Sequence, residues 1–287
     1  MIGSFLERES DPHVASRRAL IEEPNVLPAP DVPVVMARAA NVLGPAVDAL
    51  VASVAEHGLG VLQLDEPLSN SRFCELGTLF GNAMPETDPA VLPQVEGDVV
   101  LNLISAHGHT SDVSRQPFGT NALSLHTEGS GRATAEQPRY IILMCCNPGG
   151  DATAAQTVLV PMATVHDRLP ADVAQLLSRT RYRTTHDVPW LLRQEAGRPV
   201  FSFRDFQQQT LEWELDGMAD PEAVSDAIRQ LLRAIYTRAG VSGVHWRRSA
   251  VVVLDNRYFF HGRVAGAVEP LGEPRHLKRL RIAGSVP

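Results

Sequence analysis

Apolar residues recur along the chain at two spacings, and each spacing predicts a different kind of element. From residue 34 to residue 57 they return every three or four positions, which predicts an amphipathic helix that ends at Gly58. The same spacing predicts three more helices, over 73–80, over 163–180 and from Asp220-Pro221 to Gly240. The last of these is expected to begin at Asp220 because aspartate caps free amide groups and proline needs no amide partner.

Short runs of β-branched and other apolar residues predict strands, and these runs outnumber the helices. They lie at 60–64, 99–104, 139–146, 157–160, 200–203, 211–215, 251–254, 258–261 and 277–282. This pattern predicts an α+β or mainly β fold, with a double-stranded β-helix core of the jelly-roll or cupin-like type and flanking helices. Residues 1–33 are rich in proline and charge and show no sustained period, so we expect an N-terminal arm before a single domain at 34–287.

Composition narrows the class of protein. The 26 basic and 33 acidic residues give a net charge of −7 without a long basic run, which argues against a nucleic-acid partner. No apolar run approaches the roughly 18 residues of a membrane span, and the N-terminus has no leader pattern. Cys74, Cys145 and Cys146 are too few and too badly spaced for a disulfide framework, so we expect a soluble, cytoplasmic protein.

Candidate chemistry begins at His126 and Glu128, which lie two apart and would share one face of an extended segment. About one such pair is expected by chance, so the pair indicates a metal site only in combination with later residues. His261 ends a strongly apolar strand, and the three together would supply two imidazoles and a carboxylate, leaving three positions of an octahedral metal open. His107 and His109 share a loop and form a second candidate pair, although loop histidines are usually only solvated.

Four ordered motifs carry a resemblance that extends from about Gly58 to Ile282. They are His126-x-Glu128, Gly149-Gly150-Asp151-Ala152-Thr153, Asp255-Asn256 with His261-Gly262-Arg263, and Arg275-His276-Leu277-Lys278-Arg279. In this order they resemble the iron(II)/2-oxoglutarate-dependent dioxygenases of the taurine dioxygenase and clavaminate synthase-like group. The glutamate in the first motif leans toward the clavaminate synthase and amino-acid hydroxylase branch.

The resemblance implies roles for individual residues. His126, Glu128 and His261 would bind iron(II), and Arg275 would clamp the distal carboxylate of 2-oxoglutarate, which a planar guanidinium suits. Thr153 would complete that pocket.

Other assignments are less direct. Thr157 competes with Thr153, because Ala152 departs from the usual motif and leaves the register open. Arg279 would support the co-substrate or meet an acidic group of the substrate. Asp255 and Arg263 are expected to hold the turn that aims His261.

The expected reaction is oxidation, chiefly hydroxylation, of a small polar substrate such as an amino acid or natural-product intermediate. Oxygen and 2-oxoglutarate would be consumed, and succinate and carbon dioxide released. Glu128 fills the position that a halogenase of this fold leaves vacant for chloride, so desaturation and cyclisation are the alternatives within the class. Asn102 and Asp205 are candidate substrate contacts.

Two other classes of protein stay open. A non-catalytic cupin-like binding protein would share the double sheet, and a zinc hydrolase would use the same three ligands with one open position.

Overall fold

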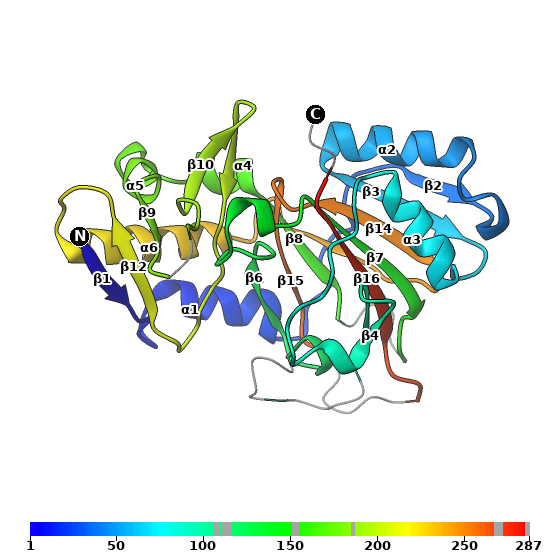
Figure 1. Cartoon of the computed structure of the whole chain (residues 1–287). Coiled ribbons are helices and arrows are strands. Elements are labelled where there is room, and N and C mark those ends of the chain that lie inside the picture. Colours follow the sequence, from blue (N-terminus) through cyan, green and yellow to red (C-terminus); the bar gives the residue numbers. More distant parts are fainter. Residues whose placement is uncertain (106–109, 111–115, 151–154, 185–186, 267–271, 285–287) are drawn as a thin grey trace.

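Two β-sheets face each other, and helices cover the outer side of each (Figure 1). The computed structural model describes residues 1–105, 110, 116–150, 155–184, 187–266 and 272–284. The larger sheet has the strand order β2-β3-β14-β7-β16-β5-β4, and the smaller has the order β13-β8-β15-β6. The predicted α+β class is therefore confirmed, with two multi-stranded sheets as its centre.

The strands of the larger sheet are β2 (Val34–Ala37), β3 (Leu59–Leu64), β4 (Val95–Glu96), β5 (Val100–Ile104), β7 (Tyr140–Asn147), β14 (Ala250–Asp255) and β16 (His276–Ile282). Those of the smaller are β6 (Leu123–His126), β8 (Thr157–Pro161), β13 (Ser242–Val244) and β15 (Phe259–Arg263). A third sheet joins β1 (Ile2–Phe5), β12 (Leu211–Leu215) and β9 (Thr180–Tyr182), and β10 (Leu192–Glu195) pairs with β11 (Arg198–Phe201).

The α-helices are α1 (Pro12–Arg17), α2 (Pro45–His57), α3 (Asn70–Thr78), α4 (Met162–Asp167), α5 (Ala171–Leu177) and α6 (Pro221–Ile235). A π-helical turn, η1 (Arg18–Glu22), follows α1. Short 3-10 turns are η2 (Ala39–Asn41), η3 (Leu92–Gln94), η4 (Gln116–Phe118) and η5 (Thr134–Glu136). No helix within the described residues is both long and apolar enough to cross a membrane.

Alternation along the strands assigns each side chain to a layer. In β7, Ile142 and Met144 are buried beneath α2 and α3, while Ile141 and Leu143 point toward the smaller sheet. In β8, Val158 and Val160 join the core beneath α6, and Leu159 lies between the sheets. The result is four layers, helix, sheet, sheet and helix.

Two predicted helices are shorter than expected, for local reasons. The segment 34–57 begins with β2, which pairs in parallel with β3, and its helix starts only at Pro45. The segment 163–180 is divided between α4 and α5 at Pro170, because proline cannot continue a helix. Gly58 does end α2, in a left-handed conformation with φ of 69°.

The predicted helix from Asp220-Pro221 to Gly240 begins as expected but ends early. Asp220 accepts a hydrogen bond from the amide of Glu222 at 2.9 Å, so it caps α6. The helix ends at Ile235 instead of reaching Gly240. The Arg168 guanidinium donates to the carbonyl oxygens of Ala234 and Ala239, so side-chain hydrogen bonds replace the last helical ones.

The N-terminal residues differ from the expected arm, because they contribute to the body. Strand β1 pairs with β12, and Leu20, Ile21 and Leu27 are buried in the same core cluster as α6. Arg17 is also buried, and its guanidinium lies 2.7 Å from Glu7 and 2.9 Å from Asp205. These elements are too short for a hydrophobic period to reveal them.

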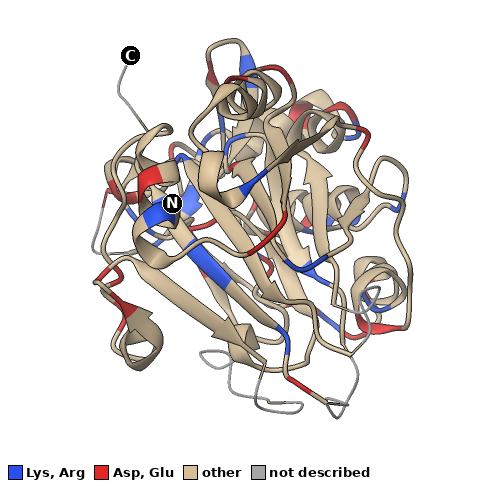
Figure 2. Cartoon of the chain, turned by 90° about the vertical axis from the view of Figure 1, so that its right-hand side faces the viewer, with Lys and Arg blue, Asp and Glu red and all other residues tan. Residues whose placement is uncertain are grey.

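Charged residues of both signs are interspersed over the elements (Figure 2). This distribution agrees with the sequence, in which acidic and basic residues are nearly balanced. Large fields of positive charge are the feature that promotes binding to polyanions.

Replacement of Glu7 by glutamine should lower stability in a pH-dependent way. Burial alone would raise the pKa of Glu7, but hydrogen bonds from Arg17 and His13 outweigh it and lower the pKa from 4.5 to about 2. Because the folded pKa lies below the unfolded one, the stabilisation is complete above pH 4.5 and is lost as the pH falls toward 2. We expect Glu7→Gln to reduce the free energy of unfolding by about 1–3 kcal/mol at pH 7.

Urea denaturation at several pH values tests this expectation, with the exposed Glu9→Gln as the control variant. If the loss of unfolding free energy in Glu7→Gln stays constant from pH 7 to pH 3, the expectation is contradicted.

Candidate metal centre

The register between β6 and β15 places two histidines opposite each other. His261 pairs with His126 across the antiparallel ladder, and their ring centroids are 4.4 Å apart. Their neighbours Phe260 and Leu125 point into the outer core, so both imidazoles face the space between the sheets. Two residues 135 positions apart in the sequence thus share one face of the smaller sheet.

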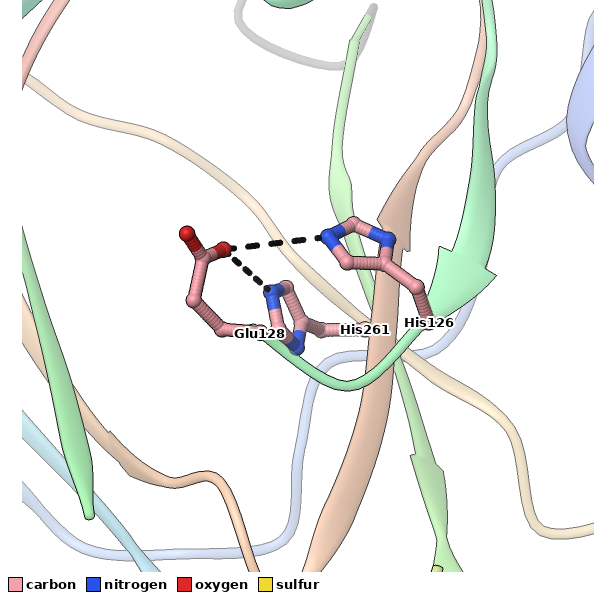
Figure 3. Close-up of side chains that lie close together, drawn as sticks. All are labelled: His126, Glu128 and His261. Atoms are coloured by element: carbon pink, nitrogen blue, oxygen red, sulfur yellow. Dashed lines mark ion pairs between the residues drawn. The ribbon is translucent and has the colours of Figure 1, made fainter. Parts of the chain in front are cut away.

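Glu128 lies in the turn after β6, and a side chain from the turn before β15 fixes its backbone. Its amide donates to Oδ1 of Asn256 at 2.8 Å, and Nδ2 of Asn256 donates to the carbonyl oxygens of Glu128 and Pro138 at 3.0 Å. The carboxylate turns back toward the imidazoles, as Figure 3 shows. Its Oε2 is 3.9 Å from Nε2 of each histidine.

The protonation of this cluster suits metal binding. Nδ1 of His126 lies 2.8 Å from the carbonyl oxygen of Ser124, which can only accept, so Nε2 keeps its lone pair. Burial lowers the pKa of His126, and it lowers that of His261 to about 3. Burial would raise the pKa of Glu128, but the charges of Arg279 and the two histidines lower it to about 2. At neutral pH the cluster therefore presents two neutral imidazoles and one carboxylate.

One ion can contact all three side chains, because their ligand atoms lie within 4.8 Å of one another. Two imidazole nitrogens and one carboxylate oxygen form the set that non-haem iron(II) oxygenases use. The orientation of His126 by a backbone carbonyl is the outer-shell contact expected of a metal-binding histidine. These residues fit an iron(II) ion.

The cluster opens into a cavity of about 720 Å³ between the sheets. The inner face of β16 lines it, because Leu277 points inward and residues at even spacing from it share that face. Arg275, Arg279 and Arg281 therefore bring three guanidinium groups to the cavity wall.

Arg275 is a buried cation without a counterion among the described residues. It is 8% exposed, and its Nε has no hydrogen-bond partner there. Burial lowers its pKa to about 10, so it is still charged at neutral pH. An unpaired buried charge is costly, and a carboxylate bound from the cavity would remove that cost.

Arg279 and Arg281 are paired by carboxylates. Arg279 donates to Glu86 at 2.8 Å and to Glu128 at 3.1 Å. Arg281 lies 2.9 Å from the second oxygen of Glu86. Glu86 and Arg281 were not predicted from the sequence. Period-two spacing from Arg279 would have revealed Arg281, whereas Glu86 lies in an irregular segment without a signal.

The other predicted residues are distributed differently. Thr157 lines the cavity, and its hydroxyl accepts a hydrogen bond from Trp246 at 3.1 Å. Asp205 is buried, bonds to Arg17 and Tyr236, and lines a second cavity of about 430 Å³. Asn102 is opposite Lys278 in the sheet, on the face away from the cavity, and bonds to Glu96. Thr153, His107 and His109 lie outside the described residues.

Of the two residues expected to hold the turn before His261, Asp255 does so and Arg263 does not. Asp255 accepts from the amide of Arg257 at 2.8 Å and pairs with Arg139 at 2.7 Å. Arg263 instead donates to the carbonyl oxygens of Gln116, Pro117 and Asn121, so it holds the loop before β6.

Solved structures share this fold at low sequence identity. PvcB from Pseudomonas aeruginosa is 21% identical with a TM-score of 0.65, and the alignment covers 92% of this chain and 89% of PvcB. PvcB is described as an Fe, alpha-ketoglutarate dependent oxygenase from an isonitrile synthetic pathway. OrfP, a non-heme iron oxygenase solved with Fe and alpha-ketoglutaric acid, is 17% identical with a TM-score of 0.61, covering 88% of this chain and 94% of its own.

An asparagine oxygenase was solved with Fe(II), 2S,3S-3-hydroxyasparagine and succinate. It is 16% identical with a TM-score of 0.60, and the alignment covers 82% of this chain and 77% of that enzyme. No curated protein sequence matches the chain significantly.

A family match extends over residues 31–281. It confirms the predicted family and enzyme class, a dioxygenase and hence an oxidoreductase, and the iron and 2-oxoglutarate named for the neighbours agree with the predicted cofactors. Because this match includes nearly the whole sequence, the chain belongs to the taurine catabolism dioxygenase TauD, TfdA family.

Proposed function

We propose that this chain is an iron(II)- and 2-oxoglutarate-dependent oxygenase that hydroxylates a small polar substrate. The observation that supports this most is the placement of the His126, Glu128 and His261 cluster in the same cavity as Arg275, a cation that has no carboxylate partner among the residues the structure describes. A metal site alone would suit several classes of protein, whereas a buried cation beside it calls for an anionic co-substrate.

Each residue has one role in this proposal. His126, Glu128 and His261 hold iron(II), which supplies the oxidation chemistry together with 2-oxoglutarate and oxygen. Arg275 binds the distal carboxylate of 2-oxoglutarate in bidentate fashion. Thr157, whose hydroxyl already lines the cavity, is the candidate for completing that pocket, and the sequence assignment to Thr153 stays a prediction.

Arg279 positions the carboxylate ligand. It contacts Glu128 through one nitrogen and Glu86 through the other, so it restrains the carboxylate before a metal binds. The buried ion pair also keeps Glu128 ionised. This role differs from the two that the sequence suggested for Arg279, which were support of the co-substrate and contact with an acidic group of the substrate.

Hydroxylation is the reaction we favour. The structural neighbours include an oxygenase that forms hydroxyasparagine and an enzyme of an isonitrile pathway, which supports an amino acid or natural-product intermediate as substrate. Glu128 fills the ligand position that a chloride would need, and desaturation or cyclisation stays the alternative. The family match weighs against a cupin-like binding protein and a zinc hydrolase, and so does Arg275, which has no counterion in the described part of the chain.

We also interpret the two facing sheets as the halves of a double-stranded β-helix within one domain. The antiparallel pairing of β6, β15, β8 and β13 opposite the larger sheet supports this interpretation.

The three cysteines of the chain are free thiols, which suits the reducing cytoplasmic location expected from the sequence.

Anaerobic titration of the iron(II)-loaded protein with 2-oxoglutarate tests the proposed function directly. We expect a weak visible charge-transfer band, because a chelated 2-oxo acid needs both an open face on the metal and a site for its distal carboxylate. Turnover of a substrate should then release succinate. Iron binding without the band would contradict the assignment of Arg275 and favour a binding protein or hydrolase.

Substitution should separate the metal ligands from the co-substrate clamp. His126→Ala or His261→Ala should reduce iron affinity by more than the roughly 10- to 100-fold that loss of an outer-shell partner costs. Arg275→Gln should keep iron binding and raise the dissociation constant for 2-oxoglutarate about 10- to 100-fold, because a charge-assisted hydrogen bond is lost.

Calorimetric titration of metal and 2-oxoglutarate measures both constants, and His57→Ala, at a partly exposed histidine outside the cluster, is the control. Equal loss of iron in the Arg275 variant would refute the division of roles.

A methyl group at Gly262 should disturb the metal centre without touching a ligand. A Cβ there would lie 2.5 Å from the carbonyl oxygen of Leu123, so β6 and β15 would have to separate. We expect Gly262→Ala to weaken iron binding at least tenfold, because His126 and His261 lie on these two strands. Gly131→Ala is the control, since a Cβ there has nothing within 4 Å. Equal iron affinity in both variants, measured by calorimetry, would contradict the expectation.

A further inference from the structure

Arg204 occupies the same face of the smaller sheet as His126. The amide of Thr127 donates to the carbonyl oxygen of Phe203 at 2.8 Å, and the amide of Asp205 donates to that of Leu125 at 3.1 Å. Between these bonds, Arg204 forms an antiparallel bridge with His126. Side chains across such a bridge point to the same side, so Arg204 faces the cavity that holds the metal cluster.

The charge of Arg204 is not used within the described part of the chain. Arg279 and Arg281 are paired with Glu86 and Glu128, whereas no described carboxylate lies within 4.0 Å of Arg204. Its one aromatic contact is with Phe206, whose ring centroid is 5.4 Å from the guanidinium carbon. Stacking on an aromatic ring leaves the edge of a guanidinium free to bind a planar anion.

The backbone at Arg204 is held in place, although its guanidinium pairs with no carboxylate of the described residues. The amide of Arg204 donates to the hydroxyl of Tyr182 at 2.8 Å. The next residue, Asp205, is buried and accepts hydrogen bonds from Arg17 at 2.9 Å and from Tyr236 at 2.7 Å. A guanidinium on a fixed backbone loses little freedom on binding, which is the property of a preformed recognition group.

The balance of charge in the cavity favours an anion. Among the described residues that line it, six are arginines and three are carboxylates. The two positive charges of iron(II) and the two negative charges of 2-oxoglutarate cancel each other, so the excess persists when both are bound. Arg275 is assigned to 2-oxoglutarate, Arg263 bonds to backbone carbonyls, and Arg132 is exposed in the segment that follows Glu128. Arg204 is therefore the cation on the His126 face that is available to a substrate.

We propose that the substrate carries a carboxylate and that Arg204 binds it. This inference rests on the proposed function and narrows it to an anionic class of substrate. Arg204 and Phe206 also line the second cavity, so the remainder of a larger carboxylic acid has room beyond the anion site. A planar guanidinium and a carboxylate form a bidentate pair, which fixes the orientation of the substrate as well as its affinity.

Binding of paired probes to the loaded protein tests this proposal. Free amino acids, N-acetyl amino acids and aryl carboxylic acids, each beside its neutral carboxamide, are titrated calorimetrically into the full chain with Mn(II) and 2-oxoglutarate. We expect the tightest ligand to be a carboxylate that binds at least tenfold more tightly than its carboxamide. In Arg204→Gln that preference should fall to about twofold or less, while Arg204→Lys should retain part of it.

Arg198→Gln is the matched control, because Arg198 is exposed and stacks on Tyr258 with 4.3 Å between its guanidinium carbon and the ring centroid. It should keep the full preference. Urea denaturation of each variant shows whether a lost carboxylate preference results from misfolding. The affinity for 2-oxoglutarate, measured first on the same samples, should be unchanged in Arg204→Gln.

The outcomes separate the two proposals. Failure of the wild-type protein to bind metal and 2-oxoglutarate refutes the proposed function. If both bind normally, any of three results overturns the assignment of Arg204 alone. They are no binding of any carboxylate, a preference for neutral or cationic probes, and a carboxylate preference that persists in folded Arg204→Gln.

Discussion

The antiparallel pairing of β6 with β15 is the constraint on which the candidate site depends. It sets His126 opposite His261 and, through the alternation of strand residues, turns both into the space between the sheets. A slip of one residue in either strand would move its imidazole to the outer core. Gly262 permits this close approach, and Asn256 ties the turn that carries Glu128 to the turn that precedes β15.

Electrostatics divides four of the six arginines that line the cavity into two groups. Glu86 and Glu128 neutralise Arg279 and Arg281, and this buried network keeps Glu128 ionised. Arg275 and Arg204 stay without a described counterion. They come from opposite sides of the cavity, one beside β16 in the larger sheet and the other beside β6 in the smaller. Within the described residues, a cation without a carboxylate partner therefore lies on each side of the candidate metal centre, which suits an anionic co-substrate and an anionic substrate bound at the same time.

The helical layer contributes to the site as well as to stability. Arg17 at the end of α1 and Tyr236 at the end of α6 both bond to the buried carboxylate of Asp205. Asp205 follows Arg204, and its amide bonds to β6 beside His126. The segment that carries Arg204 is thus held from the helical side by residues of α1 and of the segment that follows α6. Asp205, which the sequence suggested as a substrate contact, therefore forms its hydrogen bonds within the protein.

Local pattern in the sequence was sufficient for the longer strands and for the start of α6, because strand alternation and helix capping act over short distances. It also indicated His126, Glu128 and His261 as candidate ligands, an assignment that stays a prediction, and the family resemblance added Arg275. The sequence missed Glu86 and Arg281 and misjudged Asn102 and the N-terminal residues. In each case the deciding contact joins segments far apart in the chain, such as Arg17 with Asp205 or Glu86 with Arg279. Only tertiary structure decides which buried charges are paired and which stay free to bind a ligand, because hydrophobic period says nothing about partners across a cavity.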